Sequence, residues 1–437
     1  METRKKPKND LNIKIIPKSS HLFQAEIKVA STIISKIYEQ ILDSYKKSTS
    51  PQGFNNKNIP LEYIKENYQK EIEWEIKNFL FKHFVFDFLM EEIINKKIHL
   101  TNYPRLVDII TNQNDEIIFI FDLSIAEPIE IKEWKNFIFR PPKRKRYKDL
   151  DKQVTLFLKK QISLFKKHPQ NIIQENDWVC FEAIPLDKNK KQLLDNHKKI
   201  YWLRVSNKYI KKPFHSSLLN KKIGDSFITN NLAIKNEFSP HNEEENHHLF
   251  FIKIKNITKG TYFCLDSFRN NFKLKSKTEV HKKLIEVFSY RNDISQRKAI
   301  IEELFHILLS KHRFEVAKHF VIRRQEDILN MLKTHPDYQV YKTQEDFMNN
   351  IETLAEKQLK EEILIDQLAY KENIKVDHKD IQSYLYLFNN NRLKEFVYFR
   401  PILEKIEDSD KTLQTGILKQ SVLREKTLNY IIHILTK

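Results

Sequence analysis

Apolar and polar residues alternate near the start of the chain, and the pattern then changes to a helical spacing. Residues 23–29 alternate, as in a strand that buries one face. Over residues 31–45 and 60–79, apolar side chains recur three and four positions apart, which predicts two amphipathic helices. Residues 117–126 are strand-like again. The order strand, helix, loop, helix, strand predicts a compact α+β domain over residues 1–139.

A Pro-Pro pair and a basic run end this first pattern. Residues 140–171 are predicted to be a linker that contains a helix from about Asp149. Short strand-like runs separated by polar turns follow, at residues 176–186, 198–205, 223–234 and 247–257. These runs predict a second, β-rich domain over residues 172–258.

From Lys277 the apolar spacing is helical almost to the end, so residues 259–437 are predicted to form an all-α domain. Thr343 and Asp346 resemble a capping box that opens a long helix ending near Lys371, and Asp377 is a further candidate cap. The fold class is therefore α+β and multidomain. Scattered aromatic residues in the helical region suggest a binding surface, although core packing is the ordinary role of such residues.

Composition narrows the functions that this fold can carry. A net charge of +18 implies an acidic partner, such as ribosomal RNA, another nucleic acid or an anionic membrane face. The chain has only four glycines, and it contains neither a glycine-rich phosphate loop nor a nucleophile elbow, so we expect no ATP and no other cofactor. The segment HNEEENHH (residues 241–248) is interpreted as a solvated loop rather than a metal site.

The expected location is the cytoplasm. The start of the chain is basic but lacks the apolar core of a secretory signal, and no run of apolar residues is long enough to span a membrane. The most apolar stretch, NFLFKHFVFDFLM (residues 78–90), contains Lys82, His83 and Asp87 and predicts a buried helix. Cys180 and Cys264 have no metal-binding spacing, so we expect reduced thiols.

One of the rare glycines opens the segment GFNNKNIP (residues 53–60), in the polar loop between the first two predicted helices. This segment resembles the ribosome-docking signature of bacterial trigger factors, Gly-Phe-Arg-x-Gly-Lys-x-Pro, which lies between two helices of an N-terminal α+β domain. Gly53, Phe54 and Pro60 match it. The ribosome-binding residues implied by the resemblance are Gly53, Phe54, Asn55, Asn56, Lys57, Asn58 and Pro60.

The segment departs from the signature at both of its cations. Asn55 stands where the family has arginine, and Asn58 where it has lysine. Lys57 lies one residue earlier than the family's lysine, and we expect it to supply the phosphate contact as a point charge.

The resemblance to trigger factors continues along the chain in the family's domain order. It includes a helix ahead of the middle domain, the run KKPFHSSLLNKKIGDSF (residues 211–227) and three later helical segments, at residues 279–321, 354–381 and 423–432. Residues 211–227 are similar to part of the family's prolyl isomerase domain of the FKBP type. The resemblance implies that Glu182, Trp202 and Phe214 line a prolyl pocket, where rotation about a partial double bond needs no covalent chemistry.

The resemblance implies an ATP-independent chaperone that docks on the ribosome near the exit tunnel and binds nascent and unfolded polypeptides. It also implies prolyl isomerase activity, a homodimer away from the ribosome, and no metal or membrane partner. In the middle domain, Pro213 replaces a glycine of the family, and HNEEENHH replaces the segment that carries a pocket tyrosine. We therefore expect an FKBP-like fold with an eroded active site.

Two other classes of function stay open. The basic run RPPKRKRYK (residues 140–148) is compatible with an RNA-binding protein, although a solvated linker is its ordinary role. A chaperone that holds unfolded proteins without any ribosome contact is compatible with the altered docking signature. An RNA-binding protein is expected to bind free RNA even after loss of the loop at residues 53–60. A chaperone of the second class is expected to bind unfolded proteins without any affinity for ribosomes.

Overall fold

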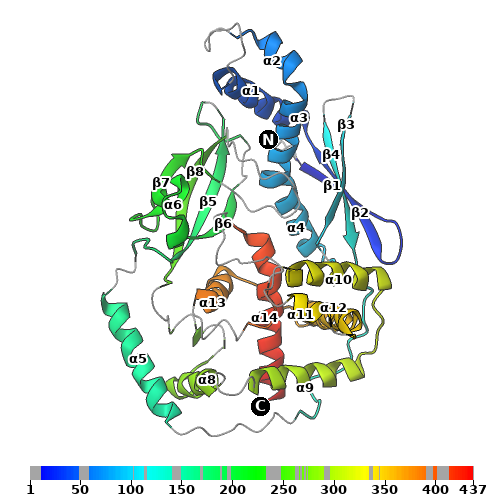
Figure 1. Cartoon of the computed structure of the whole chain (residues 1–437), viewed down its shortest axis with the longest axis vertical. Coiled ribbons are helices and arrows are strands. Elements are labelled where there is room, and N and C mark those ends of the chain that lie inside the picture. The colour runs from blue at the N-terminus through cyan, green and yellow to red at the C-terminus, as the bar shows by residue number, and fades with distance from the viewer. Residues whose placement is uncertain are drawn as a thin grey trace, which may run out of the picture.

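The structure is a computed structural model. It describes residues 11–48, 59–101, 103–112, 116–139, 149–167, 171–187, 189–193, 198–232, 248–260, 265, 268–269, 272, 274–289, 296–333, 338–343, 345–389, 397–400 and 413–436. Figure 1 shows the N-terminal sheet and its helices in the upper part, a second sheet beside them, and the C-terminal helices below. No helix within these ranges is long and apolar enough to cross a membrane.

The N-terminal part is an antiparallel sheet covered by helices. Its strands lie in the order β1 (Leu11–Pro17), β2 (Leu22–Val29), β4 (Ile117–Ser124) and β3 (Arg105–Thr111). Its helices are α1 (Ser31–Ser48), α2 (Leu61–Asn67), α3 (Gln69–Leu80), a π-helical turn (Phe81–Val85) and α4 (Phe86–Asn95). Alternate residues of the two central strands, such as Ile27 and Phe119, are fully buried, as the period of two requires.

The strands predicted at residues 23–29 and 117–126 and the buried helical stretch at residues 78–90 are confirmed. The prediction of one helix over residues 60–79 is wrong. Tyr68, with φ −122° and ψ 19°, leaves the helical conformation and separates α2 from α3.

The middle part is built on a second antiparallel sheet, reached through helix α5 (Leu150–Lys167). The strand order is β7 (Ser226–Thr229), β8 (Leu249–Thr258), β5 (Trp178–Leu186), β6 (Lys199–Arg204) and β9 (Leu413–Gln414). A short helix, α6 (Pro213–Leu218), packs on it. All four predicted strand runs and the helix after Asp149 are confirmed. The fifth strand, β9, comes from the C-terminal region, so the sheet is completed from outside residues 172–258.

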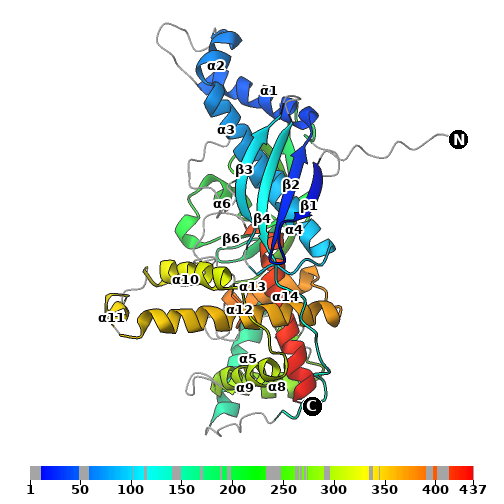
Figure 2. The same ribbon diagram turned by 90° about the vertical axis from the view of Figure 1, so that its right-hand side faces the viewer.

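The C-terminal region is helical, as predicted, apart from β9. Its helices are α8 (Lys277–Ser289), α9 (Gln296–Lys311), α10 (Lys318–Lys333), α11 (Tyr338–Lys342), α12 (Phe347–Lys371), α13 (His378–Asn389) and α14 (Thr415–Leu435). Figures 1 and 2 show α14 running through the centre of the region, while α10, α11 and α12 project to one side as a hairpin.

Two predicted helix caps have different outcomes. The Asp377 cap is confirmed, since its Oδ1 accepts a hydrogen bond of 2.9 Å from the backbone N–H of Asp380. The capping box of Thr343 and Asp346 is wrong. Asp346 takes the capping position of α12 without a side-chain hydrogen bond, and the Thr343 hydroxyl donates to the carbonyl oxygen of Val340 instead.

Candidate functional sites

Pro60, the last of the predicted docking residues, lies beside α2 at one end of the molecule. Figure 1 shows α2 at its upper end, far from the C-terminal helices. Gly53, Phe54, Asn55, Asn56, Lys57 and Asn58 lie outside the described residues, between the ends of α1 and α2. Pro60 is described, and it is the residue that caps α2, with φ −61° and ψ 140°.

Two apolar contacts fix the base of this loop. Ile59, directly before Pro60, is only 2% exposed and packs into the N-terminal core. The rings of Tyr45 on α1 and Tyr68 at the α2–α3 break lie 5.5 Å apart. The two chain ends that carry the loop are therefore held on a rigid frame, an arrangement common for loops with a binding role.

Trp202 and Glu182, predicted for the prolyl pocket, lie on one face of the middle sheet. Trp202 pairs with Cys180 across β5 and β6, and Glu182 is two residues further along β5, so the strand alternation places them on one side. The Trp202 ring lies 5.2 Å from that of His378 on α13, and Cys180 Sγ lies 3.2 Å from His378 Nε2. Glu182 forms an ion pair of 2.5 Å with Lys255.

Phe214, the third predicted pocket residue, lies on the opposite face. It belongs to α6, and its ring centroid lies 5.3 Å from that of Phe181 and 6.2 Å from that of Phe227. Phe181 is adjacent to Cys180 and therefore points away from Trp202. The structure does not bring the three predicted residues into one pocket, because the sheet separates Phe214 from the other two.

The hairpin of α10, α11 and α12 forms an arm with its own small core. Residues on its inner faces, such as Ile328 and Leu359, are buried against each other. Its outer surface carries exposed apolar side chains, which are Ile322, Met331, Val340, Met348 and Leu354. An arm that exposes several large apolar side chains is a candidate surface for binding unfolded polypeptide.

Charged residues fix the base of the arm to α14. The Arg424 guanidinium donates to both carboxylate oxygens of Asp366, at 2.9 and 2.8 Å, and contacts Glu362 at 2.8 Å. Arg324 on α10 donates to both oxygens of Glu362, at 2.8 and 2.9 Å. Burial acts to raise the pKa of Glu362, but the two guanidinium groups outweigh it and hold that pKa below its ordinary value. This network joins three helices and holds the arm in one direction.

A groove of about 610 Å³ lies between the base of the arm and the N-terminal part. Its lining includes His21, Pro128, Ile129, Phe314 and Phe320. The lining also includes charged side chains, such as Glu127, Arg313 and Lys318, so the groove is both apolar and charged.

His248, the last residue of the segment HNEEENHH, is the only one described, and it packs on Phe79 with ring centroids 3.7 Å apart. Within the described residues, no group of three or more His, Cys, Asp or Glu side chains is placed to hold a metal ion.

Two protein-family models match the sequence of this chain. A family model described as bacterial trigger factor protein matches residues 12–156, and the model of its C-terminus matches residues 275–433. The interval between them, residues 157–274, holds the strands β5 to β8 of the middle sheet. The two matched ranges include the loop predicted to dock, at residues 53–60, and the arm.

Individual relatives match over about four-fifths of the chain. The chain is 20% identical over 374 residues to the trigger factor of Geotalea daltonii, covering 82% of each chain. It is 20% identical over 364 residues to that of Chlorobaculum tepidum, covering 79% of this chain and 80% of the relative. A solved structure titled "Promiscuous Substrate Recognition in Folding and Assembly Activities of the Trigger Factor Chaperone" aligns over 97% of this chain and 99% of its own, with 15% identity and a TM-score of 0.37.

Proposed function

Because the chain belongs to the bacterial trigger factor family, we propose that it is an ATP-independent molecular chaperone that docks on the ribosome near the exit tunnel and shields nascent chains. The observation that carries the proposal is the arm, where apolar side chains are exposed on a hairpin that already has its own core. Such side chains add little to the stability of the chain, and they are available to unfolded segments. No step of this function needs a bound nucleotide.

Docking is assigned to the loop between α1 and α2. Phe54 and Lys57 are its two strongest contacts in this proposal, one apolar and one cationic. The lysine ammonium binds an RNA phosphate as a point charge, without the two-point geometry of an arginine. The net charge of +18 adds a general, salt-dependent attraction to the anionic ribosome.

The test is co-sedimentation of the intact chain with ribosomes at low and at moderate salt. The double substitution Phe54→Ala and Lys57→Ala is expected to abolish pelleting without changing the circular dichroism spectrum. Lys65 and Lys70 are exposed on the neighbouring helices α2 and α3, so Lys65→Ala with Lys70→Ala removes at least as much charge outside the loop. That control is expected to pellet like the unchanged chain.

Other outcomes point to the two alternative functions. Pelleting that ignores the loop, together with tight binding to free RNA, would favour a general RNA-binding protein that uses the basic run at residues 140–148. Absence of pelleting by the unchanged chain would favour a chaperone that acts away from the ribosome. The cytoplasm remains the expected location in each case.

Prolyl isomerase activity is a separate part of the proposal, and its support comes from the family resemblance of the middle domain. The opposite placement of Trp202 and Phe214 argues against a pocket made by both. We expect slow isomerisation of a proline-containing peptide by the intact chain, measured in a protease-coupled assay. A rate equal to that of an efficient FKBP-type enzyme would contradict this expectation.

A further inference from the structure

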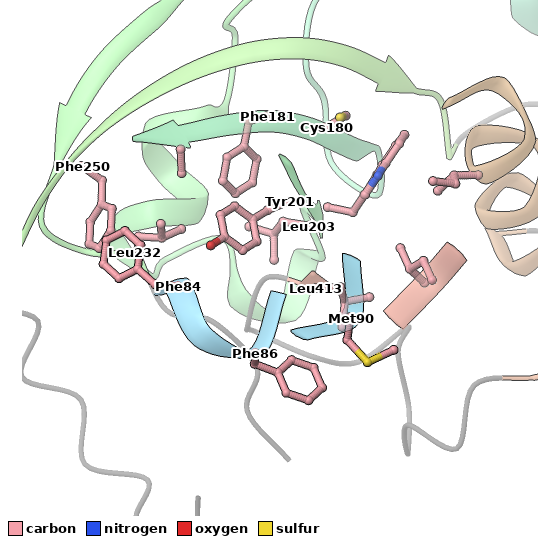
Figure 3. Close-up of a cluster of buried hydrophobic side chains, with 14 of the residues drawn as sticks. Phe84, Phe86, Met90, Cys180, Phe181, Tyr201, Leu203, Leu232, Phe250 and Leu413 are labelled. Atoms are coloured by element: carbon pink, nitrogen blue, oxygen red, sulfur yellow. The ribbon is translucent and has the colours of Figure 1, made fainter. Parts of the chain in front are cut away.

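The N-terminal part covers one face of the middle sheet with aromatic side chains. Figure 3 shows Phe84 pointing from the N-terminal helices toward Phe250 and Leu232, with Tyr201 and Phe181 beside them. Each of these side chains is at most 2% exposed. Phe214 of α6 packs on this same face, against Phe181. A continuous aromatic surface of the middle sheet is therefore occupied by a side chain of another domain.

The segment that carries Phe84 has an unusual backbone. Residues Phe81–Val85 form a π-helical turn between α3 and α4. Such turns are rare and are found frequently at functional sites. The turn places His83, whose ring lies 4.9 Å from that of Phe250, beside Phe84. One turn earlier, Phe79 stacks on His248 with ring centroids 3.7 Å apart.

The rim of this contact is polar and charged. Lys199 Nζ on β6 lies 3.5 Å from a carboxylate oxygen of Glu91 and 4.0 Å from one of Asp87, both on α4. The Gln40 amide on α1 donates a buried hydrogen bond of 2.7 Å to the carbonyl oxygen of Leu186 at the end of β5. Buried charge pairs contribute little net stability, and interfaces between separable domains are more polar than domain cores. The composition of the rim therefore fits two surfaces that separate and close again.

We propose that the aromatic face of the middle sheet is a peptide-binding surface and that Phe84 occupies it as an internal substitute for an aromatic side chain of a client. The N-terminal domain and an unfolded client segment then compete for the same place. The occupant is an apolar, aromatic-bearing peptide, because the face offers Phe181, Tyr201 and Phe250. This inference rests on the proposed function as a chaperone.

The aromatic face can bind a peptide only in molecules in which Phe84 has left it. The apparent affinity for the peptide is therefore the intrinsic affinity multiplied by the fraction of molecules in that open state. Any change that weakens the rim without touching the aromatic face should therefore raise that affinity. Glu91 is suited to this test, because its side chain is 57% exposed and lies in a contact with Lys199. The substitution Glu91→Lys replaces an attraction by a repulsion and leaves Phe84 in place.

The experiment measures the anisotropy of a fluorescein-labelled peptide, Gly-Ser-Ala-Leu-Phe-Pro-Phe-Ala-Ser-Gly, with the full chain in the absence of ribosomes. Glu91→Lys is expected to bind it about tenfold more tightly than the unchanged chain. Glu92→Lys makes the same charge change at the next position of α4, where Glu92 pairs with Lys96 on its own helix, and it is expected to leave binding unchanged. Adding Phe227→Ala to Glu91→Lys removes an aromatic ring from the face and is expected to cancel the gain.

Hydrogen–deuterium exchange over residues 79–91 and 249–254 reports whether the contact opens in Glu91→Lys. Faster exchange with tighter peptide binding supports the proposal. Faster exchange without tighter binding overturns it, because the freed face then binds no peptide. Unchanged exchange also overturns it, because the contact is then a permanent core. Ribosome co-sedimentation is unaffected by these outcomes, so failure here leaves the proposed docking function to its own test.

Discussion

At the scale of single residues, the clearest pH dependence comes from Glu361 on α12. Burial is the main cause that raises the pKa of its carboxyl to about 7, although the hydroxyl of Tyr398 donates to it at 2.8 Å. A raised carboxyl pKa adds stability below the unfolded value of 4.5, and this stability is lost as the pH rises through 7. Glu361→Gln keeps an acceptor for Tyr398 and removes the charge. We expect it to stabilise the chain by about 2 kcal/mol at pH 8.

Calorimetry at pH 5 and pH 8 checks this prediction. The variant should melt a few degrees above the unchanged chain at pH 8 and close to it at pH 5. Glu303→Gln, at an exposed position of α9, is the matched control and should melt with the unchanged chain at both pH values. A shift of Glu361→Gln that is equal at the two pH values would show that the carboxyl does not titrate as described.

At the scale of elements, the arm makes a prediction about client binding. Val340, Met348 and Leu354 are 64%, 53% and 43% exposed on α11 and α12. Changing all three to serine removes apolar contact area for clients and should leave the melting temperature almost unchanged, because exposed positions contribute little to stability. Light scattering of an aggregating unfolded protein should then require several-fold more of the variant for the same protection.

The control for the arm is the same polarity change on β3, where Val107 and Ile110 are 51% and 43% exposed. Replacing both by serine should leave protection against aggregation unchanged. Equal loss of protection in the two variants would mean that clients bind exposed apolar residues without preference for the arm.

The elements also show which parts of the fold were predictable from sequence. Strands β2, β5 and β8 were predicted because burial of alternate or successive apolar residues leaves a local pattern. Strand β3 was not predicted, because an edge strand with mostly exposed residues has no clear alternation. Two-residue strand β9 is too short to show any period.

The candidate sites follow the same rule. The docking loop could be predicted because the signature that it resembles is contiguous in sequence, and it stays a prediction. The surroundings of Trp202 could not be predicted, since its neighbours His378 and Leu413 are more than 170 positions away and no local pattern links them to β6. The cover of the aromatic face by Phe84 is a long-range contact of the same kind.

At the scale of the whole molecule, the middle sheet is held between the two other parts of the chain rather than attached by a linker alone. The N-terminal helices cover one face, α13 lies against the other, and β9 extends the edge of β6. Leu413 on β9 is a suitable residue for testing how the C-terminal region is attached to the middle sheet, because it is 1% exposed and pairs with Trp202. Leu413→Ala should cost about 2–4 kcal/mol, the usual range for removing a buried leucine side chain.

Because β6 contacts both β9 and α13, we expect these three elements to lose protection from hydrogen–deuterium exchange together. In Leu413→Ala, hydrogen–deuterium exchange should become faster in β6 and α13 as well as near residue 413. Leu413 pairs with Trp202 on β6, and the Trp202 ring contacts His378 on α13. Ile228→Ala on β7, at the opposite and exposed edge of the same sheet, should change neither stability nor exchange appreciably. Faster exchange confined to residues 413–436 would mean that the middle sheet is an independent unit. Faster exchange across β6 and α13 would mean that release of the middle domain requires the C-terminal strand to leave as well.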